Sequence, residues 1–505
     1  MKGAGVLRVL VVVAAGAATV AGATAMDRTY LVDGAPRRVA PAADRPGRPL
    51  TAVSLLCPGP ETAGVPGLPA PRAGGPGTVV DLLAAAAPAG VPGALGAELP
   101  DGSTTLSALP GGVELRRSAV GTAVLAAPVA GARGGLVSAT GGLAPTLVGL
   151  QRSLVPAGER RVLSSAPCSV PQADAWLLAG SGQAGRQEHL VLVNPHGTAA
   201  TVDITVLGAK GPIIGVAGRG VVVPARGRTV VLLDALDGAE VSPAAHVQVR
   251  AGTVHATLHD GWLDGIVPRG GDDTAASAPP ETEQVLPGVS VSGPVDPVVV
   301  RVAVPGTAPS DVRVSVLGPS GPLPGVTVTR RVAGRATADL GLPSLPSGVY
   351  AVQVQGSTPV VAAASVGRAD GARPAGPATV ASPVRDLAWA VAASPLHDLA
   401  GVPLGVQAGA ALDERLSVAN PTSRPATATL TLVDPAGLPS PRLLTIPPAS
   451  AVSVAVGGSA SVWLRPDVPG VRAALVTEAE GGLITSSPLT ARSQTTVPFV
   501  VSRQG

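Results

Sequence analysis

The most informative part of the sequence is His189-Leu-Val-Leu-Val-Asn194-Pro195, followed by Thr201-Val-Asp-Ile-Thr-Val-Leu-Gly208-Ala-Lys-Gly211-Pro212. In its second part Val202, Ile204 and Val206 alternate with polar residues. A period of two places the apolar side chains on one face of a β-strand and the polar side chains on the other. The stretch therefore predicts strands with one buried face, separated by turns.

The same pattern recurs twice further along the chain. The second copy begins at Val300-Arg-Val-Ala-Val-Pro305 and continues as Asp311-Val-Arg-Val-Ser-Val-Leu-Gly318-Pro-Ser-Gly321-Pro322. The third begins at Arg415-Leu-Ser-Val-Ala-Asn420-Pro421 and continues as Thr427-Ala-Thr-Leu-Thr-Leu-Val-Asp434-Pro-Ala-Gly437. Copies spaced by roughly 110 residues indicate three related domains.

Turn residues occupy matching positions in the copies. Pro at the second place and Gly at the fourth suit a type I turn. The two asparagines of the chain both precede a proline at a strand end, where an Asn side chain can close a local turn and proline cannot continue the ladder. The predicted structural turn residues are Asn194, Pro195, Gly211, Gly321, Asn420, Pro421 and Gly437.

These patterns predict an all-β protein of tandem antiparallel β-sandwich units, immunoglobulin-like, with about seven strands each. An N-terminal β unit with weaker patterning is expected at residues 50–170, and a short helix is possible within it at 81–87. The expected repeats span 171–268, 281–366 and 384–505, with linkers near 269–280 and 367–383.

The N-terminus has the pattern of an export segment. Lys2 and Arg8 precede an uncharged stretch, residues 9–26, which closes on Ala23-Thr24-Ala25. A basic start, an apolar middle and an A-x-A end are typical of a signal peptide, and the length also reaches the lower limit for a membrane span. Residues 1–26 are therefore either a cleaved signal peptide or a signal anchor whose basic flank stays cytoplasmic. Residues 27–49, rich in Pro and Arg, are expected to be a tether.

Two cysteines agree with export. Cys57 and Cys168 are the only thiols in the chain. An even number of cysteines outside the cytoplasm usually forms bridges. We therefore expect a disulfide between them, with two unrelated buried thiols as the alternative.

At this point the chain resembles a family of exported actinobacterial proteins known only as a domain of unknown function. The resemblance rests on Cys168 followed by Asp174-Ala-Trp176, on Leu190-Val-Leu-Val-Asn194-Pro195 and on the repeated strands. Leu177 stands where the family usually has an aromatic residue. Membership implies an extracytoplasmic, membrane-tethered protein and implies no known activity.

The amino-acid composition narrows the classes of partner that the protein is expected to bind. Of 505 residues, 46% are hydrophobic and 14% charged, which is enough apolar material for cores and excludes a wholly disordered chain. The net charge is only +3 and there is no long basic run, so we expect no nucleic-acid partner. Aromatic residues make up 1% of the chain, which disfavours stacking platforms and hence glycan or lipid partners.

No motif indicates catalysis, a cofactor or a metal. Gly180–Gly185 fits G-x-G-x-x-G but precedes a strand, so a hairpin turn is expected rather than a dinucleotide site. His255 and His259 lie four residues apart on a strand, roughly 13 Å from each other, too far to bind one ion together. The acid pairs Asp272-Asp273 and Asp413-Glu414 are expected to be solvated.

We therefore expect a non-enzymatic, extracytoplasmic structural or protein-interaction component of the cell envelope, secreted or anchored through residues 9–26 if these are not cleaved. Its expected partner is another envelope protein. The alternative is a cell-wall-associated hydrolase or ligand-binding accessory with its site in the N-terminal unit. A pocket that brings together several of the acids of that unit would favour the alternative: Glu61, Asp81, Glu98, Asp101 and Glu114.

Overall fold

The computed structural model describes residues 39–41, 48–61, 79–118, 124–158, 160–213, 215, 217–238, 240–369, 384–405, 411–491, 493–496 and 499–501. The chain divides into two compact units, one of residues 1–48 with 495–505 and one of residues 49–494. In the first, strand β1 (Val39–Pro41) pairs antiparallel with β37 (Phe499–Val501). The short strands β2 (Arg48–Pro49) and β36 (Thr495–Thr496) lie where the two units adjoin in sequence. The expected export segment, residues 1–26, lies outside the described residues, as does most of the expected tether.

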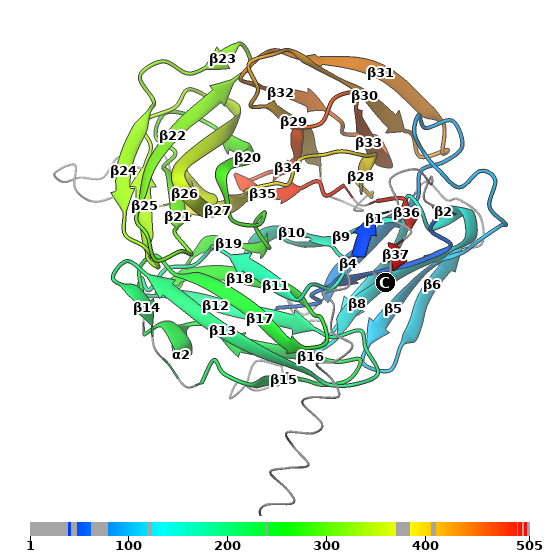
Figure 1. The fold of residues 1–505 in the computed structure, drawn as a ribbon, viewed down its shortest axis with the longest axis horizontal. Coiled ribbons are helices and arrows are strands. Elements are labelled where there is room, and N and C mark those ends of the chain that lie inside the picture. Colours follow the sequence, from blue (N-terminus) through cyan, green and yellow to red (C-terminus); the bar gives the residue numbers. More distant parts are fainter. Residues whose placement is uncertain are drawn as a thin grey trace, which may run out of the picture. The chain divides into compact units, whose positions relative to one another are not determined.

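Residues 49–494 contain four β-sandwiches, which we number 1 to 4 along the chain (Figure 1). Sandwich 1 has one sheet in the order β3 (Ala52–Cys57), β8 (Gly134–Thr140), β5 (Thr104–Leu109) and β6 (Val113–Ser118). Its second sheet has the order β10 (Val162–Cys168), β9 (Val148–Val155), β4 (Val79–Ala85) and β7 (Leu125–Ala130). A 3-10 turn, η1 (Gly141–Leu143), follows β8. The helix expected at 81–87 is wrong, because β7 and β9 pair with β4 on either side and satisfy its backbone as a central strand.

Sandwich 2 contains the first copy of the alternating strand pattern, residues 189–212. One sheet has the order β11 (Asp174–Leu177), β17 (Ala244–Ala251), β13 (Ala200–Gly208) and β14 (Gly211–Ile213), and β15 (Val221–Val223) also pairs with β13. The other has the order β16 (Arg228–Leu232), β12 (Arg186–Val193), β18 (His255–Asp264) and β19 (Val267–Ala275), and a one-turn helix, α2 (Asp234–Asp237), follows β16. Along β13 the even-numbered apolar residues are buried, as a period of two requires. The linker expected near 269–280 is wrong, since most of it forms β19.

Sandwich 3 is built around one long strand. Its strands are β20 (Glu281–Val291), β21 (Val298–Ala303), β22 (Ser310–Gly318), β23 (Gly321–Pro322), β24 (Val328–Val332), β25 (Thr337–Gly341), β26 (Gly348–Ala369) and β27 (Val384–Val391). The first half of β26 pairs with β20 and β22, and its second half pairs with β21 and β27. One strand therefore serves both layers of this sandwich.

Sandwich 4 again has two four-stranded sheets. They have the orders β28 (Ala400–Pro403), β33 (Ser461–Pro466), β30 (Ala426–Val433), β31 (Pro439–Ile446), and β32 (Ser450–Ala455), β29 (Leu412–Asn420), β34 (Arg472–Ala479), β35 (Leu483–Pro488). The described ladders of all four sandwiches are antiparallel, so the predicted all-β fold of tandem sandwiches is confirmed. Counted over the described residues, each sandwich has eight or nine strands rather than about seven, because short strands such as β14 and β23 extend the sheet edges.

Apolar side chains fill each sandwich and also the junctions between them. The core of sandwich 2 continues into sandwich 3 through residues such as Ala303 and Val361. A smaller cluster joins Leu56 of sandwich 1 to Val191 of sandwich 2, and another joins Leu317 of sandwich 3 to Ala419 of sandwich 4. Sandwich 4 packs back on sandwich 1, where Trp463 and Val433 meet Ala85 and Val91. The junctions thus run in a closed cycle, 1 to 2 to 3 to 4 and back to 1.

Candidate functional site

One edge strand from each sandwich meets the others in a second, inner cycle. The strands β10, β19, β27 and β35 each pair with a single neighbour in their own sheet. Across sandwiches, β10 contacts β19, β19 contacts β27, β27 contacts β35 and β35 contacts β10. We call these four strands the hub; their labels lie together in Figure 1. Open edge strands invite pairing with other chains, and the hub covers four of them at once.

Strand β19 is linked to both of its hub neighbours and to β35 by buried carboxylates. Ser164 of β10 donates its hydroxyl to Asp273 Oδ2 at 2.8 Å. Asp272 accepts from the backbone N–H of Trp389 on β27 at 2.8 Å and from the hydroxyl of Thr485 on β35 at 2.7 Å. Adjacent residues of a strand point to opposite sides, so the two aspartates serve different neighbours.

The remaining links of the hub are also polar. Asp386 of β27 accepts from the backbone N–H of Ile484 on β35 at 2.7 Å. The backbone N–H of Ser165 on β10 donates to Thr485 Oγ1 at 3.1 Å, and the Ser165 hydroxyl lies 2.6 Å from that of Ser487. Every step of the inner cycle is therefore joined by at least one hydrogen bond, all of them buried.

Burial changes the ionisation of the hub carboxyl groups. Desolvation raises the pKa of Asp386 to about 8 and raises the pKa of Asp272 well above its usual range. In both cases the hydrogen bonds to the carboxylate oppose the shift without cancelling it. Around neutral pH Asp386 is therefore mainly a neutral carboxylic acid, which costs less to bury than a carboxylate.

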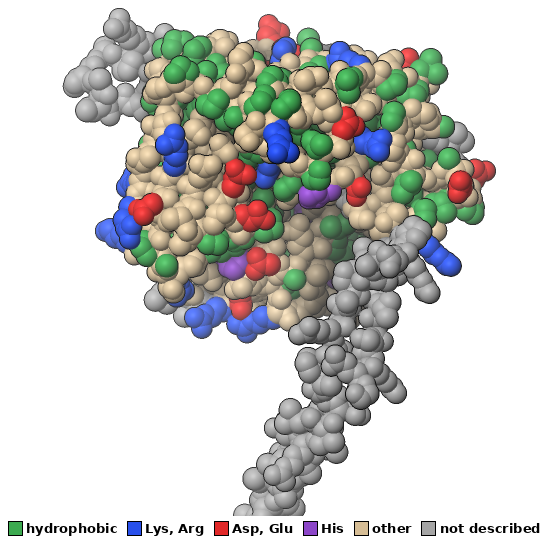
Figure 2. Space-filling model, turned by 45° about the horizontal axis from the view of Figure 1, so that its top comes forward, with side chains coloured by type: hydrophobic (Ala, Val, Ile, Leu, Met, Phe, Trp, Pro, Cys, Tyr) green, Lys and Arg blue, Asp and Glu red, His purple; other side chains and the backbone are tan. Residues whose placement is uncertain are grey.

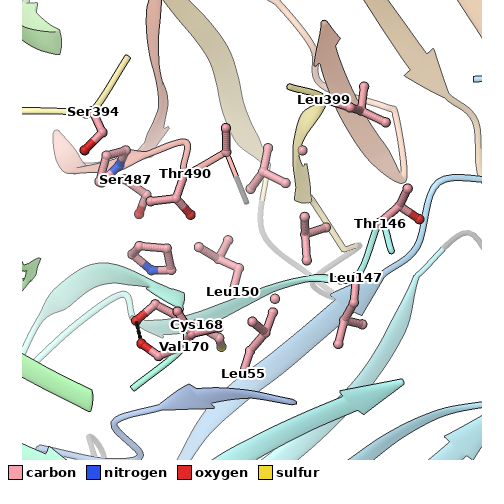
Figure 3. Close-up of a pocket in the computed structure, with 18 of the residues that line it drawn as sticks. Leu55, Thr146, Leu147, Leu150, Cys168, Val170, Ser394, Leu399, Ser487 and Thr490 are labelled. Atoms are coloured by element: carbon pink, nitrogen blue, oxygen red, sulfur yellow. Dashed lines mark hydrogen bonds between the residues drawn. The ribbon is translucent and has the colours of Figure 1, made fainter. Parts of the chain in front are cut away.

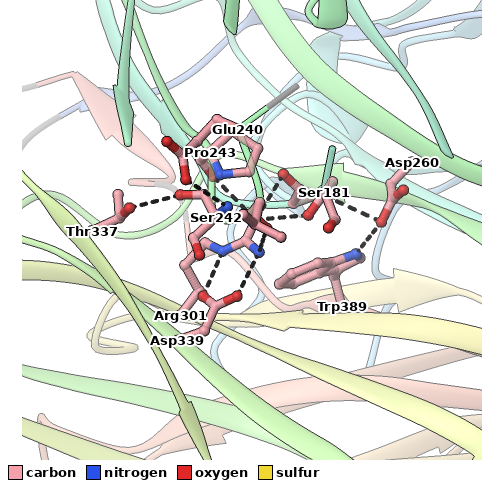
Figure 4. A network of polar contacts seen from close by, with 12 residues as sticks. Ser181, Glu240, Ser242, Pro243, Asp260, Arg301, Thr337, Asp339 and Trp389 are labelled. Carbon is pink, nitrogen blue, oxygen red and sulfur yellow. Dashed lines mark hydrogen bonds and ion pairs between the residues drawn. The ribbon is translucent and has the colours of Figure 1, made fainter. Parts of the chain in front are cut away.

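The junction between sandwiches 2 and 3 is organised by one arginine (Figure 4). Arg301 of β21 holds both oxygens of Asp339, at 2.8 and 2.9 Å, and its guanidinium lies 5.1 Å from the ring centroid of Trp389. Its other donors reach four backbone carbonyls of sandwich 2, those of Ala179, Gly180, Val241 and Pro243. A planar guanidinium that is bidentate on one side and chelates carbonyls on the other cannot be replaced by lysine.

Asp260 of β18 extends this network. It accepts from the indole N–H of Trp389 at 2.7 Å, from Arg186 at 2.5 Å and from the backbone N–H of Gly180 at 3.2 Å. Asp260 and Arg186 belong to sandwich 2 and Trp389 to sandwich 3. The charged pair thus orients the tryptophan on which Arg301 stacks.

An arginine also stands at each of the other three junctions. Arg228 of sandwich 2 donates to the carbonyl of Pro60 at 2.6 Å, Arg368 of sandwich 3 pairs with Glu478 of sandwich 4, and Arg152 of sandwich 1 pairs with Glu414 of sandwich 4 at 2.5 Å. Arg152, Arg301 and Arg368 are buried. Removing one partner of a buried pair leaves an uncompensated charge, so the loss of one of these arginines is expected to cost more than the loss of an exposed one.

A separate cluster of titratable groups lies where sandwich 1 meets sandwich 2. Ligand atoms of Glu61, His259 and Asp273 all lie within 4.8 Å of one another, and all three residues are buried. His259 Nδ1 is 3.0 Å from Asp273 Oδ1. Burial lowers the pKa of His259, but the two carboxylates outweigh it and raise the pKa to about 9. Burial also raises the pKa of Glu61.

His189 of β12 lies against this cluster. Its ring stacks on that of His259 with centroids 5.9 Å apart, and burial together with the charge of His259 lowers its pKa to about 4. Among the described residues, neither His189 Nδ1 nor Glu61 Oε2 has a hydrogen-bond partner. Buried polar atoms of native proteins are rarely left unpaired, so these two atoms mark the cluster as unusual.

A cavity of about 230 Å³ lies between sandwiches 1 and 4 (Figure 3). Its wall includes Leu55, Leu150 and Val170, with the hydroxyls of Ser394 and Thr490. The described residues that line it include no charged side chain, and Cys168 is held in a disulfide. The cavity therefore offers neither a general acid nor a general base to a bound molecule.

The predicted disulfide is confirmed. Cys57 of β3 and Cys168 of β10 are bonded, with their Cα atoms 4.5 Å apart. The two strands belong to different sheets of sandwich 1. The bond therefore ties the outer sheet of that sandwich to a hub strand.

The two Asn-Pro turns have matching hydrogen bonds. Asn194 donates to the carbonyls of Thr198, Val223 and Pro224 and accepts from the backbone of His196. Asn420 donates to the carbonyls of Arg424, Ile446 and Pro447 and accepts from the backbone of Thr422. Each asparagine closes its own turn and also bonds to the end of another strand, which is β15 for Asn194 and β31 for Asn420. Proline follows in both cases, as Pro195 and Pro421. At the ends of the predicted hairpin turns, Gly211, Gly321 and Gly437 have φ angles of 117°, 132° and 86°, values that favour glycine.

The acids of the N-terminal unit do not form one site. Glu61 belongs to the buried cluster with His259 and Asp273, and the other four do not join that group. Asp81 is half-buried in β4, while Glu98, Asp101 and Glu114 are exposed. The arrangement that would have favoured a hydrolase site in this unit is not present among the described residues.

Three smaller expectations were wrong. Gly180–Gly185 is not a hairpin turn, because β11 and β12 lie in different sheets and the loop crosses between them. Asp272-Asp273 is buried in the hub rather than solvated, because four edge strands exclude water there. In the pair Asp413-Glu414 only Asp413 is exposed, since Arg152 holds Glu414 in the junction.

Sequence reasoning missed the hub and the junction arginines. A signal for the hub was present, because the last strand of three units carries a polar doublet: Ser164-Ser165, Asp272-Asp273 and Ser486-Ser487. A doublet at the same place in each unit breaks the alternation of apolar and polar residues. No such signal marks Arg301, which follows the ordinary alternation of its strand.

No described helix is both long enough and apolar enough to cross a membrane. No curated protein matches the chain. Among solved structures, the chain is similar to a β-glucuronidase of Bacteroides uniformis, with 14% identity over 47% of this chain, 26% of the enzyme and a TM-score of 0.10. This chain therefore spans about a quarter of that enzyme's length.

Two further solved structures are similar over more of their length. One is a tetra-tandem repeat from the extending region of a large adhesion protein, with 13% identity over 78% of this chain and 92% of that one, and a TM-score of 0.10. The other is a glycoside hydrolase of family 32 from Bifidobacterium adolescentis, with 10% identity, 88% and 96% coverage, and a TM-score of 0.13. TM-scores this low carry no argument about fold or function.

The family comparison is more informative. A model described as "Family of unknown function (DUF5719)" matches residues 123–413, more than half of the chain, and its name implies no enzymatic activity. The match spans the hub strands β10, β19 and β27 and the whole of sandwiches 2 and 3. The chain belongs to DUF5719, a family of unknown function.

Proposed function

We propose that this protein is a non-enzymatic, extracytoplasmic structural or protein-interaction component of an actinobacterial cell envelope. The observation that carries the proposal is the hub with its four junction arginines. Buried polar links at every step give tandem sandwiches a fixed arrangement, which a spacer or a docking platform requires and a flexible string of domains lacks.

The chemistry of the described interior supports the same proposal. Asp272 and Asp386 of the hub engage backbone or hydroxyl partners of other strands, and the described residues that line the cavity between sandwiches 1 and 4 carry no charge. On the face shown in Figure 2, basic and acidic side chains are interspersed rather than gathered in one patch. Such a surface suits protein contacts better than a nucleic-acid backbone. The disulfide supports an oxidising location outside the cytoplasm.

A partner would bind through loops or outer edge strands. Strand β31 is the outer edge of its sheet, and Leu443 on it is 70% exposed, with Leu438 in the preceding turn 64% exposed. Exposed leucines on an edge strand are typical of a surface that another protein covers. We propose this edge as the contact surface for another envelope protein.

The test is crosslinking of the full-length protein in intact envelopes, followed by identification of the captured proteins. A matched pair of variants separates specific from incidental capture: Leu443→Glu places a charge on the exposed edge, and Val113→Glu places one on the outer strand β6, where the side chain is also exposed. We expect one reproducible partner, lost with Leu443→Glu and kept with Val113→Glu. Capture of no reproducible partner, together with hydrolysis of cell-wall polymers by the purified protein, would overturn the proposal and favour the hydrolase alternative.

A further inference from the structure

We propose that Glu61, His259 and Asp273 form a zinc site that joins sandwich 1 to sandwich 2. The set has two carboxylates and one imidazole, which are ligands that Zn²⁺ accepts. Glu61 lies in the chain of sandwich 1 after β3, and the other two residues lie on β18 and β19 of sandwich 2. A bound ion would therefore crosslink two sandwiches that the chain otherwise joins through one connection.

The spacing of the donor atoms fits a shared ion. In a tetrahedral zinc shell, ligand atoms at about 2.0 Å from the metal lie roughly 3.3 Å from one another. The three ligand atoms all lie within 4.8 Å of one another, and the His259 to Asp273 distance is 3.0 Å.

A second observation points to a ligand at this place. Glu61 is 4% exposed, its carboxylate belongs to the cluster, and its Oε2 has no hydrogen-bond partner among the described residues. A carboxylate oxygen buried without a partner costs free energy that a coordinated cation would recover. His259 and Arg228 lie near enough to favour a charged Glu61, but no described group hydrogen-bonds to this oxygen, and the proposed ion supplies a direct partner.

The surroundings resemble the outer shell of a metal site. Ser164 donates its hydroxyl to Asp273 Oδ2, which leaves Oδ1 turned toward His259. The ring of His189 stacks on that of His259 and restricts its rotation. Hydrogen bonds and packing of this kind orient metal ligands and are part of how a site gains affinity. The fourth coordination position is left for a water molecule.

The test measures zinc in the full-length protein, prepared without a polyhistidine tag. The protein is stripped with a chelator, dialysed against Zn²⁺ and then against buffer, and its zinc is measured by mass spectrometry. We expect about one zinc ion per chain, as a site with three protein ligands predicts. Less than a tenth of an ion per folded chain would overturn the proposal.

A matched pair of histidine variants identifies the site. His259→Gln removes a proposed ligand, and His255→Gln removes another buried histidine of the same strand, one that bonds to Ser169 and Thr257 instead. We expect zinc to fall at least tenfold in the first variant and to stay unchanged in the second. Equal zinc in both would contradict the assignment.

A measurement on the unmodified protein covers the case in which His259→Gln does not fold. X-ray absorption at the zinc edge distinguishes imidazole from oxygen ligands in the loaded protein. One imidazole with oxygen donors would support the site, and two or more imidazoles, or none, would exclude it.

Discussion

The interiors of the sandwiches and the hub are both buried, yet they differ in the kinds of side chain that make their contacts. Within a sandwich, residues such as Val202, Val314 and Leu430 pack into apolar clusters. In the hub, buried serines and aspartates join strands of different sandwiches. Apolar packing is strong but weakly directional, whereas hydrogen bonds specify which groups meet. Apolar clusters therefore bury both the sandwiches and their junctions, and the polar contacts of the hub add directional specificity to the way the sandwiches meet.

The largest loss of stability is expected when Arg301 is replaced. Arg301→Ala leaves Asp339 and four carbonyl groups without their donor in a buried junction, so we expect a loss of about 3–5 kcal/mol in the free energy of unfolding. Arg331→Ala is the matched control on the same sandwich, because Arg331 and its partner Asp311 are exposed. Its expected loss is less than about 1 kcal/mol. Denaturant titration of both variants measures the two values.

Equal losses in the two arginine variants would contradict the claim that the junction depends on buried charge. A loss at Arg301 confined to sandwich 3, with sandwich 2 unaffected in hydrogen exchange, would also count against it, because the arginine is bound to both.

The second effect concerns the Asn-Pro turns. Asn420→Ala removes three donated hydrogen bonds, one of them to the buried carbonyl of Ile446, so we expect a loss of about 1–3 kcal/mol in the free energy of unfolding. Asn194→Ala removes the equivalent bonds in sandwich 2, and a similar loss is expected because the two networks match. Thermal unfolding monitored by circular dichroism compares them. A loss in one variant only would show that the two turns are not equivalent.

The smallest expected effect is the pH dependence of stability that arises from Asp386 in the hub. The pKa of Asp386 is about 8 in the folded protein and near 4 in an unfolded chain, so the folded state holds its proton more tightly. The contribution of this group is therefore most favourable at low pH and is lost as the pH rises from about 4 to about 8. Asp386→Asn removes the titration while keeping one oxygen acceptor for Ile484.

Urea unfolding of the original protein and of Asp386→Asn at several pH values between 5 and 8 isolates this group, since the other titrations are common to both. We expect the variant to gain about 1 kcal/mol relative to the original protein for each pH unit of increase. A difference that does not change with pH would mean that Asp386 is ionised throughout.

Much of the fold could be predicted from the sequence, and the reason is local. The alternation along residues 201–208 and its two later copies depends only on neighbours in the chain. The prediction of tandem sandwiches rests on this local pattern. The disulfide followed from the count of cysteines. The hub could not be predicted in the same way, because Val267–Ala275 contains two glycines and two aspartates and has the composition of a linker. It becomes a strand only where three other sandwiches shield it from water.

The candidate sites were less predictable than the fold. Glu61 was singled out with acids of its own unit, but its neighbours are His259 and Asp273, about two hundred residues away in sequence. His259 was set aside because His255 could not join it at one ion, which the spacing along a strand does exclude. The residues that lie beside His259 are Asp273 on the neighbouring strand β19 and Glu61 of sandwich 1. Chain spacing cannot reveal ligands that tertiary packing brings together.

The central claim is that the hub and the junctions make the four sandwiches one cooperative unit. Differential scanning calorimetry tests it most directly, because the ratio of the van't Hoff to the calorimetric enthalpy of unfolding reports how much of the chain unfolds together. We expect a single transition for residues 49–494 with a ratio close to one, which Arg301→Ala splits into separate transitions. Separate transitions in the original protein, with sandwiches melting independently, would show that the four sandwiches are not one cooperative unit.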